Sequence, residues 1–430
     1  MNIFLGVLVG FLILMALVIA HEFGHFIAAR KNGVEVEEFG IGFPPRAVAW
    51  VRNPEYLEWK AQKKAAKGDS KKLTRLGKKP KAWLRFPKSE WGKKQKTLIF
   101  SINFLPIGGF CSMKGESDSD RRPHSFGSAS FWGKTKILFA GVTMNWLVAF
   151  VILTILSWTG MPEFMNGQFT MPGDTTITPA TVSVKDVLEN SPAEKANLKA
   201  GDVFISAYPS DSPSDITSFD TASDIIAFNK SHPKQSIIYH ISRDHEDKEI
   251  KVTLNPEDAE YLLGVTMSQE GQVLYHSTWS APIVAAANTI QLTGETYRGL
   301  GNMIGSFFSG ITKQFSSDEA TRSEGQSQIK AAGDSVSGPV GIIGVLFPNS
   351  VAAGPTTLAF LAAIISISLA CMNVLPIPAL DGGRFTLIAL FRLRGKKLTK
   401  EIEEKIVARA FIFLLILIAL VTVLDITRFF

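Results

Sequence analysis

The sequence contains little cysteine, with only Cys111 and Cys371 among its 430 residues. Two cysteines cannot supply the disulfide framework that stabilises small secreted domains. Both lie in or beside apolar segments that we expect to be associated with a membrane, on its reducing side. We therefore interpret them as small apolar packing residues.

Charge is absent or nearly absent from residues 3–20 and from three further stretches. These are Ile137–Trp158, Thr356–Val374 and Ile406–Leu424. The last contains Arg409, whose long stem can reach toward the membrane interface. A helix needs about 20 mostly apolar residues to cross the hydrocarbon core of a bilayer, so the sequence predicts four transmembrane helices. A cleaved signal peptide is the weaker interpretation of the first stretch, which has neither a basic start nor a small-residue cleavage site.

Basic and acidic residues are segregated along the chain. Residues 46–96 contain 17 Lys or Arg against four acidic residues, whereas residues 161–280 contain 18 acidic residues against eight basic ones. The short loop at residues 392–397 is again basic. Because basic loops stay on the cytoplasmic side of a membrane, four helices give one consistent topology. Both termini and the acidic region lie outside, and both basic loops lie in the cytoplasm.

The basic segment from Lys63 to Lys96 also contains Trp83, Phe86 and Trp91. Basic and aromatic residues together are typical of nucleic-acid-binding surfaces. A cytoplasmic loop that faces anionic lipid explains the same composition and is the better interpretation. We therefore predict contact with the lipid bilayer and no nucleic-acid partner.

These patterns predict a polytopic α-helical membrane protein with a membrane-associated β-loop and an inserted β-rich domain. In chain order, the expected parts are a first transmembrane helix (1–30), a cytoplasmic basic loop with a β-prone segment (31–130), a second transmembrane helix (131–160), an extracytoplasmic β-rich domain (178–266), a surface amphipathic helix (279–315), a third transmembrane helix (355–383) and a fourth (404–428). Within the β-prone segment Thr97–Gly115, the sequence Pro-Ile-Gly-Gly indicates a hairpin or looped strand. The polar segment Ser316–Gly333 is expected to be mobile.

The region 178–266 shows the alternation of a β-sheet. Apolar and polar residues alternate at 237–241 and again at 250–254, which predicts a hairpin with one buried face. The segment Ser191–Ala207 combines a short helix, a Gly-Asp turn and a strand, and it resembles the corresponding stretch of PDZ domains. Such domains bind extended peptides by adding a strand to a sheet edge. A structural β domain without a peptide ligand remains the alternative.

Residues 21–25 read His-Glu-Phe-Gly-His at the end of the first apolar stretch. On a helix, His21 and His25 share a face, and both imidazoles can bind one Zn²⁺. Glu22 is placed to accept a proton from a metal-bound water and pass it to the leaving amine. The motif lies ~27 Å along the helix from Ile3, within the membrane. The alternative, two interfacial histidines with a snorkelling glutamate, is less consistent with ionisable residues inside a span, which are usually functional.

A catalytic zinc site needs a third protein ligand, and Asp381 is the candidate. It follows the third apolar stretch at the cytoplasmic side, which is the depth expected for His21 and His25. Pro376 and Pro378 must unwind the helix end before it. The next two residues, Gly382 and Gly383, permit unusual backbone angles and close approach. A loop that merely ends the helix is the alternative interpretation.

The H-E-F-G-H helix, the L-D-G-G segment and the intervening PDZ-like domain together resemble the site-2 protease family, in particular bacterial intramembrane zinc metalloproteases of the regulator-of-sigma-E protease type. The resemblance covers nearly the whole chain. It implies that His21, His25 and Asp381 are zinc ligands, that Glu22 is the general base and that Asn373 binds substrate. It also implies a membrane-entering β-loop at Phe104–Phe110, in which Gly108 and Gly109 pair with an unwound substrate helix. Asn145 matches the asparagine of the family's G-P-x-x-N pattern.

The sequence departs from this family pattern at several positions. Val142 stands where the family usually has proline, and Arg384 stands where close relatives commonly have histidine. Only one PDZ-like domain is recognisable, and the basic insertion at residues 53–94 has no family counterpart that we can place. These departures affect the start of the second span and the polarity beside the double glycine.

The resemblance implies a protease of the bacterial inner membrane. Its substrates would be single-span membrane proteins, such as anti-sigma factors or signal-peptide remnants, and the PDZ-like domain would bind or screen them. A non-catalytic membrane scaffold is the competing hypothesis, but a scaffold would be expected to carry a degenerate metal motif. A transporter with a zinc site would need paired hydrophobic repeats, and none is found.

Overall fold

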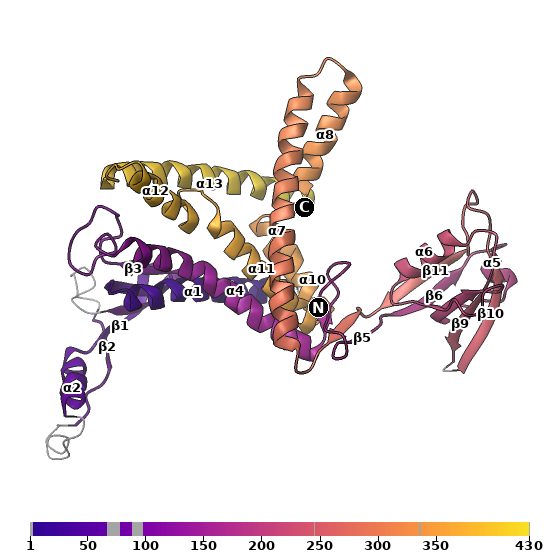
Figure 1. The fold of residues 1–430 in the computed structure, drawn as a ribbon, viewed down its shortest axis with the longest axis horizontal. Coiled ribbons are helices and arrows are strands. Elements are labelled where there is room, and N and C mark those ends of the chain that lie inside the picture. The colour runs from indigo at the N-terminus through magenta and orange to yellow at the C-terminus, as the bar shows by residue number, and fades with distance from the viewer. Residues whose placement is uncertain (1–2, 67–77, 88–97, 245, 335–336, 430) are drawn as a thin grey trace. The chain divides into compact units, whose positions relative to one another are not determined.

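A computed structural model describes residues 3–66, 78–87, 98–244, 246–334 and 337–429. Part of the basic segment, including Trp91, lies outside these residues. The chain folds into two compact units (Figure 1). The first consists of Met1–Leu153 and Thr289–Phe430, and the second of Thr154–Asn288.

Four long apolar helices dominate the first unit. They are α1 (Ile3–Lys31), α4 (Phe131–Thr159), α11 (Pro355–Val374) and α13 (Lys400–Phe429). Among the described helices, these are the ones long and apolar enough to cross a membrane, in agreement with the four predicted spans. α1 and α4 approach closely, because a Cβ atom at Gly24 would lie 2.3 Å from the carbonyl oxygen of Ala140.

A three-stranded antiparallel sheet packs against α1. Its order is β2-β1-β3, with β1 at Val36–Arg52, β2 at Trp83–Arg85 and β3 at Ile99–Met113. β3 occupies the segment expected to be a looped strand, and its partner β1 was not anticipated. The rings of Phe26, Phe39 and Phe100 pack together between the sheet and the helix. The sheet therefore lies beside the helix that carries the H-E-x-x-H motif.

The predicted third span is broken before its end. α11 stops at Val374, and α12 (Asp381–Leu393) begins after a short segment that contains Pro376 and Pro378. A Cβ atom at Gly382 would lie 2.0 Å from the carbonyl oxygen of Val374, and the first turn of α12 therefore fits against the end of α11 only with glycine there. Asp381 thus occupies the first position of a new helix rather than the end of the old one.

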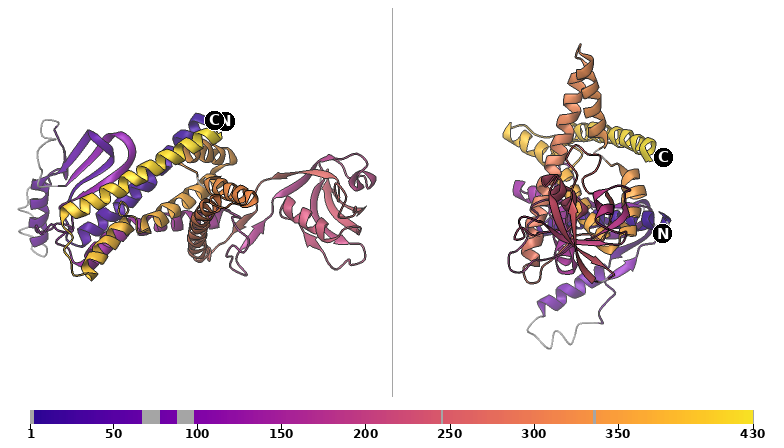
Figure 2. Two further views of the ribbon diagram at one scale, coloured as in Figure 1. Left: turned by 90° about the horizontal axis from the view of Figure 1, so that it is seen from above. Right: turned by 90° about the vertical axis from the view of Figure 1, so that its right-hand side faces the viewer.

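The segment between the second unit and α11 is largely helical. α7 (Ala281–Gln314) is one continuous helix and is not among the candidate spans. α8 (Glu319–Asp334) lies beside it in Figures 1 and 2, with an ion pair of 2.5 Å between Lys313 and Glu324. The polar segment expected to be mobile instead forms most of α8. Four further helices among the described residues were not predicted from the sequence: α2 (Pro54–Ala65), α9 (Pro339–Gly341), the π-helix η2 (Ile342–Leu346) and α10 (Phe347–Ala353).

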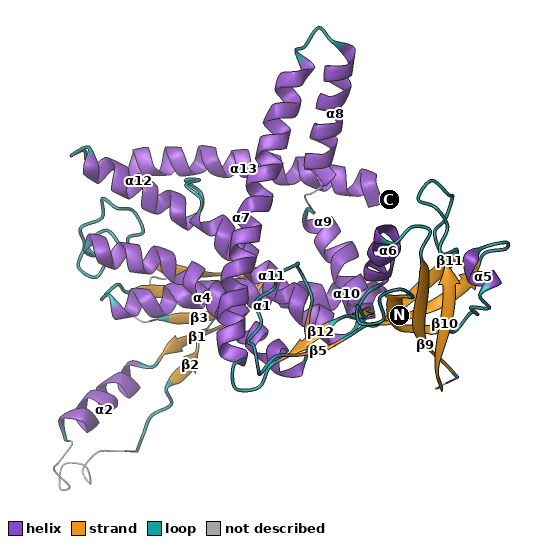
Figure 3. Ribbon diagram, turned by 45° about the vertical axis from the view of Figure 1, so that its right-hand side comes forward, coloured by secondary structure: helices purple, strands orange, loops and turns teal. Residues whose placement is uncertain are grey.

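The second unit is rich in β-structure (Figure 3). Its larger sheet has the order β10-β9-β7-β6-β11, with β8 paired to β7, and its smaller sheet has the order β4-β12-β5. The elements are β4 (Met161–Pro162), β5 (Thr176–Thr178), β6 (Thr181–Val187), α5 (Pro192–Lys195), β7 (Val203–Pro209), β8 (Thr217–Ser218), α6 (Ala222–Ser231), β9 (Ser236–Arg243), β10 (Glu246–Thr253), β11 (Val265–Glu270) and β12 (Leu274–His276).

The predicted hairpin of the second unit is confirmed as β9 and β10. The two strands pair antiparallel, with Tyr239 opposite Ile250 and Ile237 opposite Val252. Alternate residues of β9, namely Ile237, Tyr239 and Ile241, are completely buried in the core of this unit. The period of two in the sequence therefore corresponds to one buried face.

Candidate metal centre

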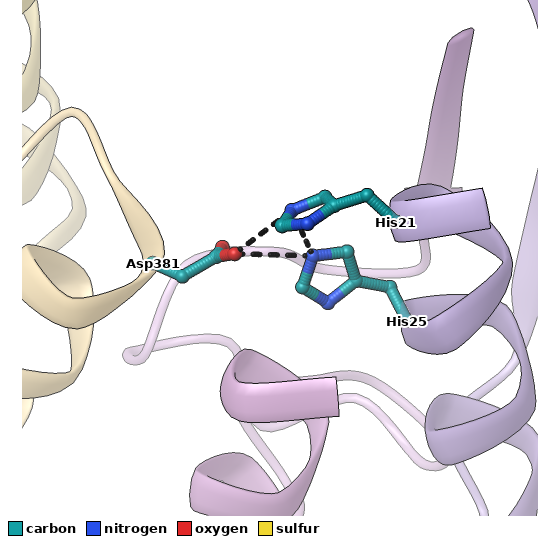
Figure 4. A group of neighbouring side chains, drawn as sticks. All are labelled: His21, His25 and Asp381. Carbon is teal, nitrogen blue, oxygen red and sulfur yellow. Dashed lines mark hydrogen bonds and ion pairs between the residues drawn. The ribbon is translucent and has the colours of Figure 1, made fainter. Parts of the chain in front are cut away.

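Three side chains from distant parts of the chain meet in the first unit (Figure 4). His21 and His25 lie one helical turn apart on α1, and Asp381 is the first residue of α12. The Oδ2 atom of Asp381 lies 3.1 Å from Nε2 of His21 and 3.2 Å from Nε2 of His25. The two Nε2 atoms are 3.1 Å apart. All three polar atoms therefore point into one small space.

The chemistry of this cluster fits a zinc ion. Two imidazole nitrogens and one carboxylate oxygen are a donor set of catalytic zinc sites, which leave a fourth position open. His21 and His25 are 8% and 6% exposed, so few water molecules reach their rings. The Oδ2 atom of Asp381 is buried without a hydrogen bond of suitable geometry from any described residue. A bound cation would satisfy this oxygen, which otherwise pays a desolvation cost.

The second ring nitrogen of each histidine faces α4. Nδ1 of His25 lies 2.8 Å from the carbonyl oxygen of Ile137 and donates its hydrogen there. This contact fixes the tautomer in which Nε2 has a free lone pair for a metal. Nδ1 of His21 lies 3.4 Å from Nδ2 of Asn145, whose Oδ1 atom is buried and has no hydrogen-bond partner among the described residues. Turning the carboxamide by 180° makes Oδ1 the acceptor for the Nδ1 hydrogen of His21.

Gly141 lies between these two contacts on α4. A Cβ atom there would come within 2.5 Å of Nε2 of His25 and 2.6 Å of Nε2 of His21. Ile137, Gly141 and Asn145 are spaced four residues apart, so they share one face of α4. This face forms the back of the metal centre. Asn145 was expected here only from the family resemblance, and Gly141 and the carbonyl group of Ile137 were not among the predicted residues.

Glu22 and the β-strand β3 lie beside the cluster. The carboxylate of Glu22 interacts with the backbone of Cys111 on β3. A Cβ atom at Gly108 would lie 3.2 Å from Val18, and one at Gly109 would lie 3.5 Å from Ile19. Both glycines are therefore in close contact with the turn of α1 that precedes His21. Residues 109–113 of β3 pair with β1 on one side, and no other described strand pairs with them.

The remaining candidate residues are not in the cluster itself. The side chain of Asn373 donates a hydrogen bond of 2.9 Å to the carbonyl oxygen of Leu369 in its own helix. Pro376 and Pro378 lie in the break between α11 and α12. Arg384, where relatives commonly have histidine, donates a hydrogen bond to the carbonyl oxygen of Glu116. Its guanidinium group therefore binds a loop next to β3.

The family follows from the whole chain rather than from the cluster alone. A family model described as peptidase family M50 matches residues 9–60 and 78–418. The chain belongs to peptidase family M50. The regulator of sigma-W protease RasP of Bacillus subtilis is 27% identical over 99% of this M50 chain and 100% of its own length. The zinc metalloprotease RasP of Shouchella clausii is 29% identical over 71% of this chain and 62% of its own length.

A chloroplast protein of a plant, also named a metalloprotease, is a further relative. The membrane metalloprotease ARASP of Arabidopsis thaliana is 26% identical over 96% of this chain and 77% of its own length. Family membership and these relatives identify the chain as an M50 metalloprotease whose metal is zinc. The donor set at His21, His25 and Asp381 agrees with that metal.

Proposed function

We propose that this chain is an intramembrane zinc protease that hydrolyses peptide bonds within membrane-spanning segments of other proteins. The observation that carries the proposal is the convergence of His21, His25 and Asp381. The two histidines lie on the candidate span α1, and Asp381 lies at the start of α12, which follows the candidate span α11. Ionisable residues inside a span are costly and are usually retained for function.

His21, His25 and Asp381 hold the metal in this mechanism, and Glu22 acts on protons. When bound, zinc would polarise the scissile carbonyl group and lower the pKa of a water molecule. Glu22 accepts the proton of that water and donates it to the leaving amine. The contacts of Nδ1 of His25 with Ile137 and of Nδ1 of His21 with Asn145 orient the two rings so that each Nε2 faces the metal position.

The edge strand β3 supports a role in holding the substrate. Peptide bonds of a membrane helix are already hydrogen-bonded within that helix, so a substrate must unwind before it is cleaved. Residues 109–113 of β3 have an unpaired edge among the described strands, and this end of the strand runs beside the turn that precedes His21. An unwound substrate segment can pair with that edge near Gly108 and Gly109. Asn373, in the last turn of α11, is then available to bind the segment from the other side of the break.

The charge pattern and the relatives support a proposal for the substrates and the topology. We assign the chain to a bacterial inner membrane, with both termini and the second unit outside and the metal centre toward the cytoplasmic side. A relative of this chain is named regulator of sigma-W protease, which supports single-span membrane substrates such as anti-sigma factors or signal-peptide remnants. The antiparallel sheet of the second unit, flanked by α5 and α6, supports a PDZ-like domain that binds or screens them.

The test uses the full-length protein in liposomes with a single-span test substrate. Glu22→Gln should keep stoichiometric zinc but lower the cleavage rate by about 10²–10⁴-fold, because only the proton-transfer group is removed. The exposed Glu37 provides a matched control, and Glu37→Gln should cleave normally. Full activity of Glu22→Gln, or no zinc in the wild-type protein, would reject the proposal.

A further inference from the structure

A cavity of about 680 Å³ opens in the first unit, away from the metal centre. Its walls are the start of α4, the end of α12 and the start of α13, together with the loop before α4. The basic residues in the lining are Arg121, Lys134, Arg392, Lys396, Lys397 and Lys400. The acidic residues in the lining are Asp118 and Glu401, so the walls carry an excess of positive charge.

Most of these basic side chains form no ion pair with a described residue, although Lys400 lies 3.7 Å from Glu404. Lys134 is buried and forms an ion pair of 2.5 Å with Asp118. Arg392 instead lies over the ring of Phe131, with 4.7 Å between its guanidinium carbon and the ring centre. Lys396 and Lys397 form no ion pair with any described residue, and both are exposed. The like charges of such a cluster repel each other, and a bound anion reduces this repulsion. The cluster therefore favours anion binding.

The position of the cavity indicates that the anion belongs to the membrane surface. Two of its walls, α4 and α13, are candidate membrane spans, and the cavity lies at the first residues of both. Trp132 and Leu393, next to lining residues in sequence, are 70% and 86% exposed. Exposed tryptophan at the end of a span is typical of the membrane–water boundary. The cavity is therefore at the depth of lipid headgroups.

The lining is also apolar enough for a lipid. Phe131, Ile388, Phe391 and Leu398 line the cavity together with the basic side chains. A soluble anion gains little from such a surface, whereas the glycerol and first acyl carbons of a phospholipid would bury it. Basic pockets between membrane helices are known to suit anionic headgroups for this reason.

We propose that this cavity binds the phosphate group of an anionic phospholipid from the bilayer. The bound headgroup joins α4, α12 and the start of α13. α12 carries Asp381 at its other end, and α4 carries Gly141 and Asn145. The lipid therefore stabilises the arrangement of the two helices that complete the metal centre, without contacting it.

The test is native mass spectrometry of the full-length zinc-loaded protein in detergent, supplied with phosphatidylglycerol or phosphatidylcholine. Wild-type protein should retain phosphatidylglycerol in preference to phosphatidylcholine. The double variant Lys396→Gln/Lys397→Gln should bind phosphatidylglycerol roughly 25-fold more weakly, since each basic residue near a lipid surface contributes about a fivefold factor. Both side chains are exposed, so zinc content should not change.

The matched control removes the same charge from nearby positions that do not line the cavity. Lys136 on α4 and Lys405 on α13 are exposed, and Lys136→Gln/Lys405→Gln should retain phosphatidylglycerol as the wild-type protein does. Equal retention of the two lipids, or equal loss in both double variants, would overturn the proposal. Competition by inorganic phosphate separates the two sources of the anion. If inorganic phosphate alone displaces phosphatidylglycerol and raises the melting temperature as much, the site binds soluble phosphate and the lipid assignment is wrong.

Discussion

A Cβ atom on Gly141 of α4 would come within 2.5 Å of Nε2 of His25 on α1. The two helices therefore meet with no side chain between the backbone of one and the metal-binding face of the other. His25 also donates its second ring hydrogen to Ile137, one turn earlier on α4. The backbone of a neighbouring helix thus helps to position the candidate metal centre.

Replacement of Gly141 by alanine should disrupt the metal centre. The added methyl group would collide with both imidazoles, which cannot move without losing their common focus on Asp381. We expect zinc affinity to fall by about 10–100-fold, as for other changes that misorient metal-binding histidines. The measurement is the zinc content of purified protein across a chelator titration. Gly299→Ala is the matched control, because no heavy atom lies within 4 Å of its added methyl group. Normal zinc affinity in Gly141→Ala would contradict this account.

Asn145 should contribute to zinc affinity through its carboxamide. Asn145→Ala removes the acceptor for Nδ1 of His21 and should weaken zinc binding by about 10–100-fold. Asn145→Asp keeps an oxygen at that position and should bind zinc more tightly than Asn145→Ala. Ser366→Ala is a control for backbone disturbance, because Ser366 donates a hydrogen bond of 2.8 Å to the carbonyl oxygen of Asn145. If Ser366→Ala weakened zinc binding as much as Asn145→Ala, the carboxamide would have no special role.

Acid should loosen one loop of the second unit through Asp174. Hydrogen bonds from Ser280 and Thr278 to its carboxylate lower the pKa of Asp174 to about 2. An unfolded aspartate has a pKa of about 3.9, so the folded state is favoured above that pH, and this stabilisation is lost as the pH falls toward 2. Hydrogen exchange of the Thr278 and Ser280 amides should therefore accelerate over that interval.

Asp174→Asn should remove this acid response, because the group no longer titrates. Exchange at the two amides should then be nearly independent of this ionisation over the same interval, after correction for the intrinsic exchange rate. The exposed Asp211 serves as a control, and Asp211→Asn should respond to acid as the wild-type protein does. An unchanged acid response in Asp174→Asn would assign the effect to another group.

The elements that sequence analysis found depend on local spacing. His21 and His25 are one helical turn apart, so a single helix brings them together wherever it packs. Asp381 was found by counting residues along an apolar stretch to an equal depth. The prolines before it predicted an unwound helix end, although not that Asp381 would start a new helix. The alternation in β9 and β10 was likewise visible because one face of a hairpin is buried.

The features that were missed depend on contacts between distant segments. α4 is apolar on all sides, so no periodicity marks the face that carries Ile137, Gly141 and Asn145. The carbonyl group of Ile137 is chemically like any other. β1 contains glycines and two prolines, which favour turns, and it is a strand because it pairs with β3. α8 is polar and has weak helical signals, but it packs on α7 through Gly310 and Gly325, whose small size permits close contact.

The metal centre joins the first helix of the chain to the penultimate one. An ion held by His21, His25 and Asp381 is therefore a tether between the two ends of the sequence, and its binding free energy adds to the stability of the fold. We therefore expect protein from which a chelator has removed the metal to be less stable than the metal-bound protein. In it, no ion holds α12 against α1. Studies of how substrates dock should use the metal-loaded Glu22→Gln protein, which keeps the tether intact.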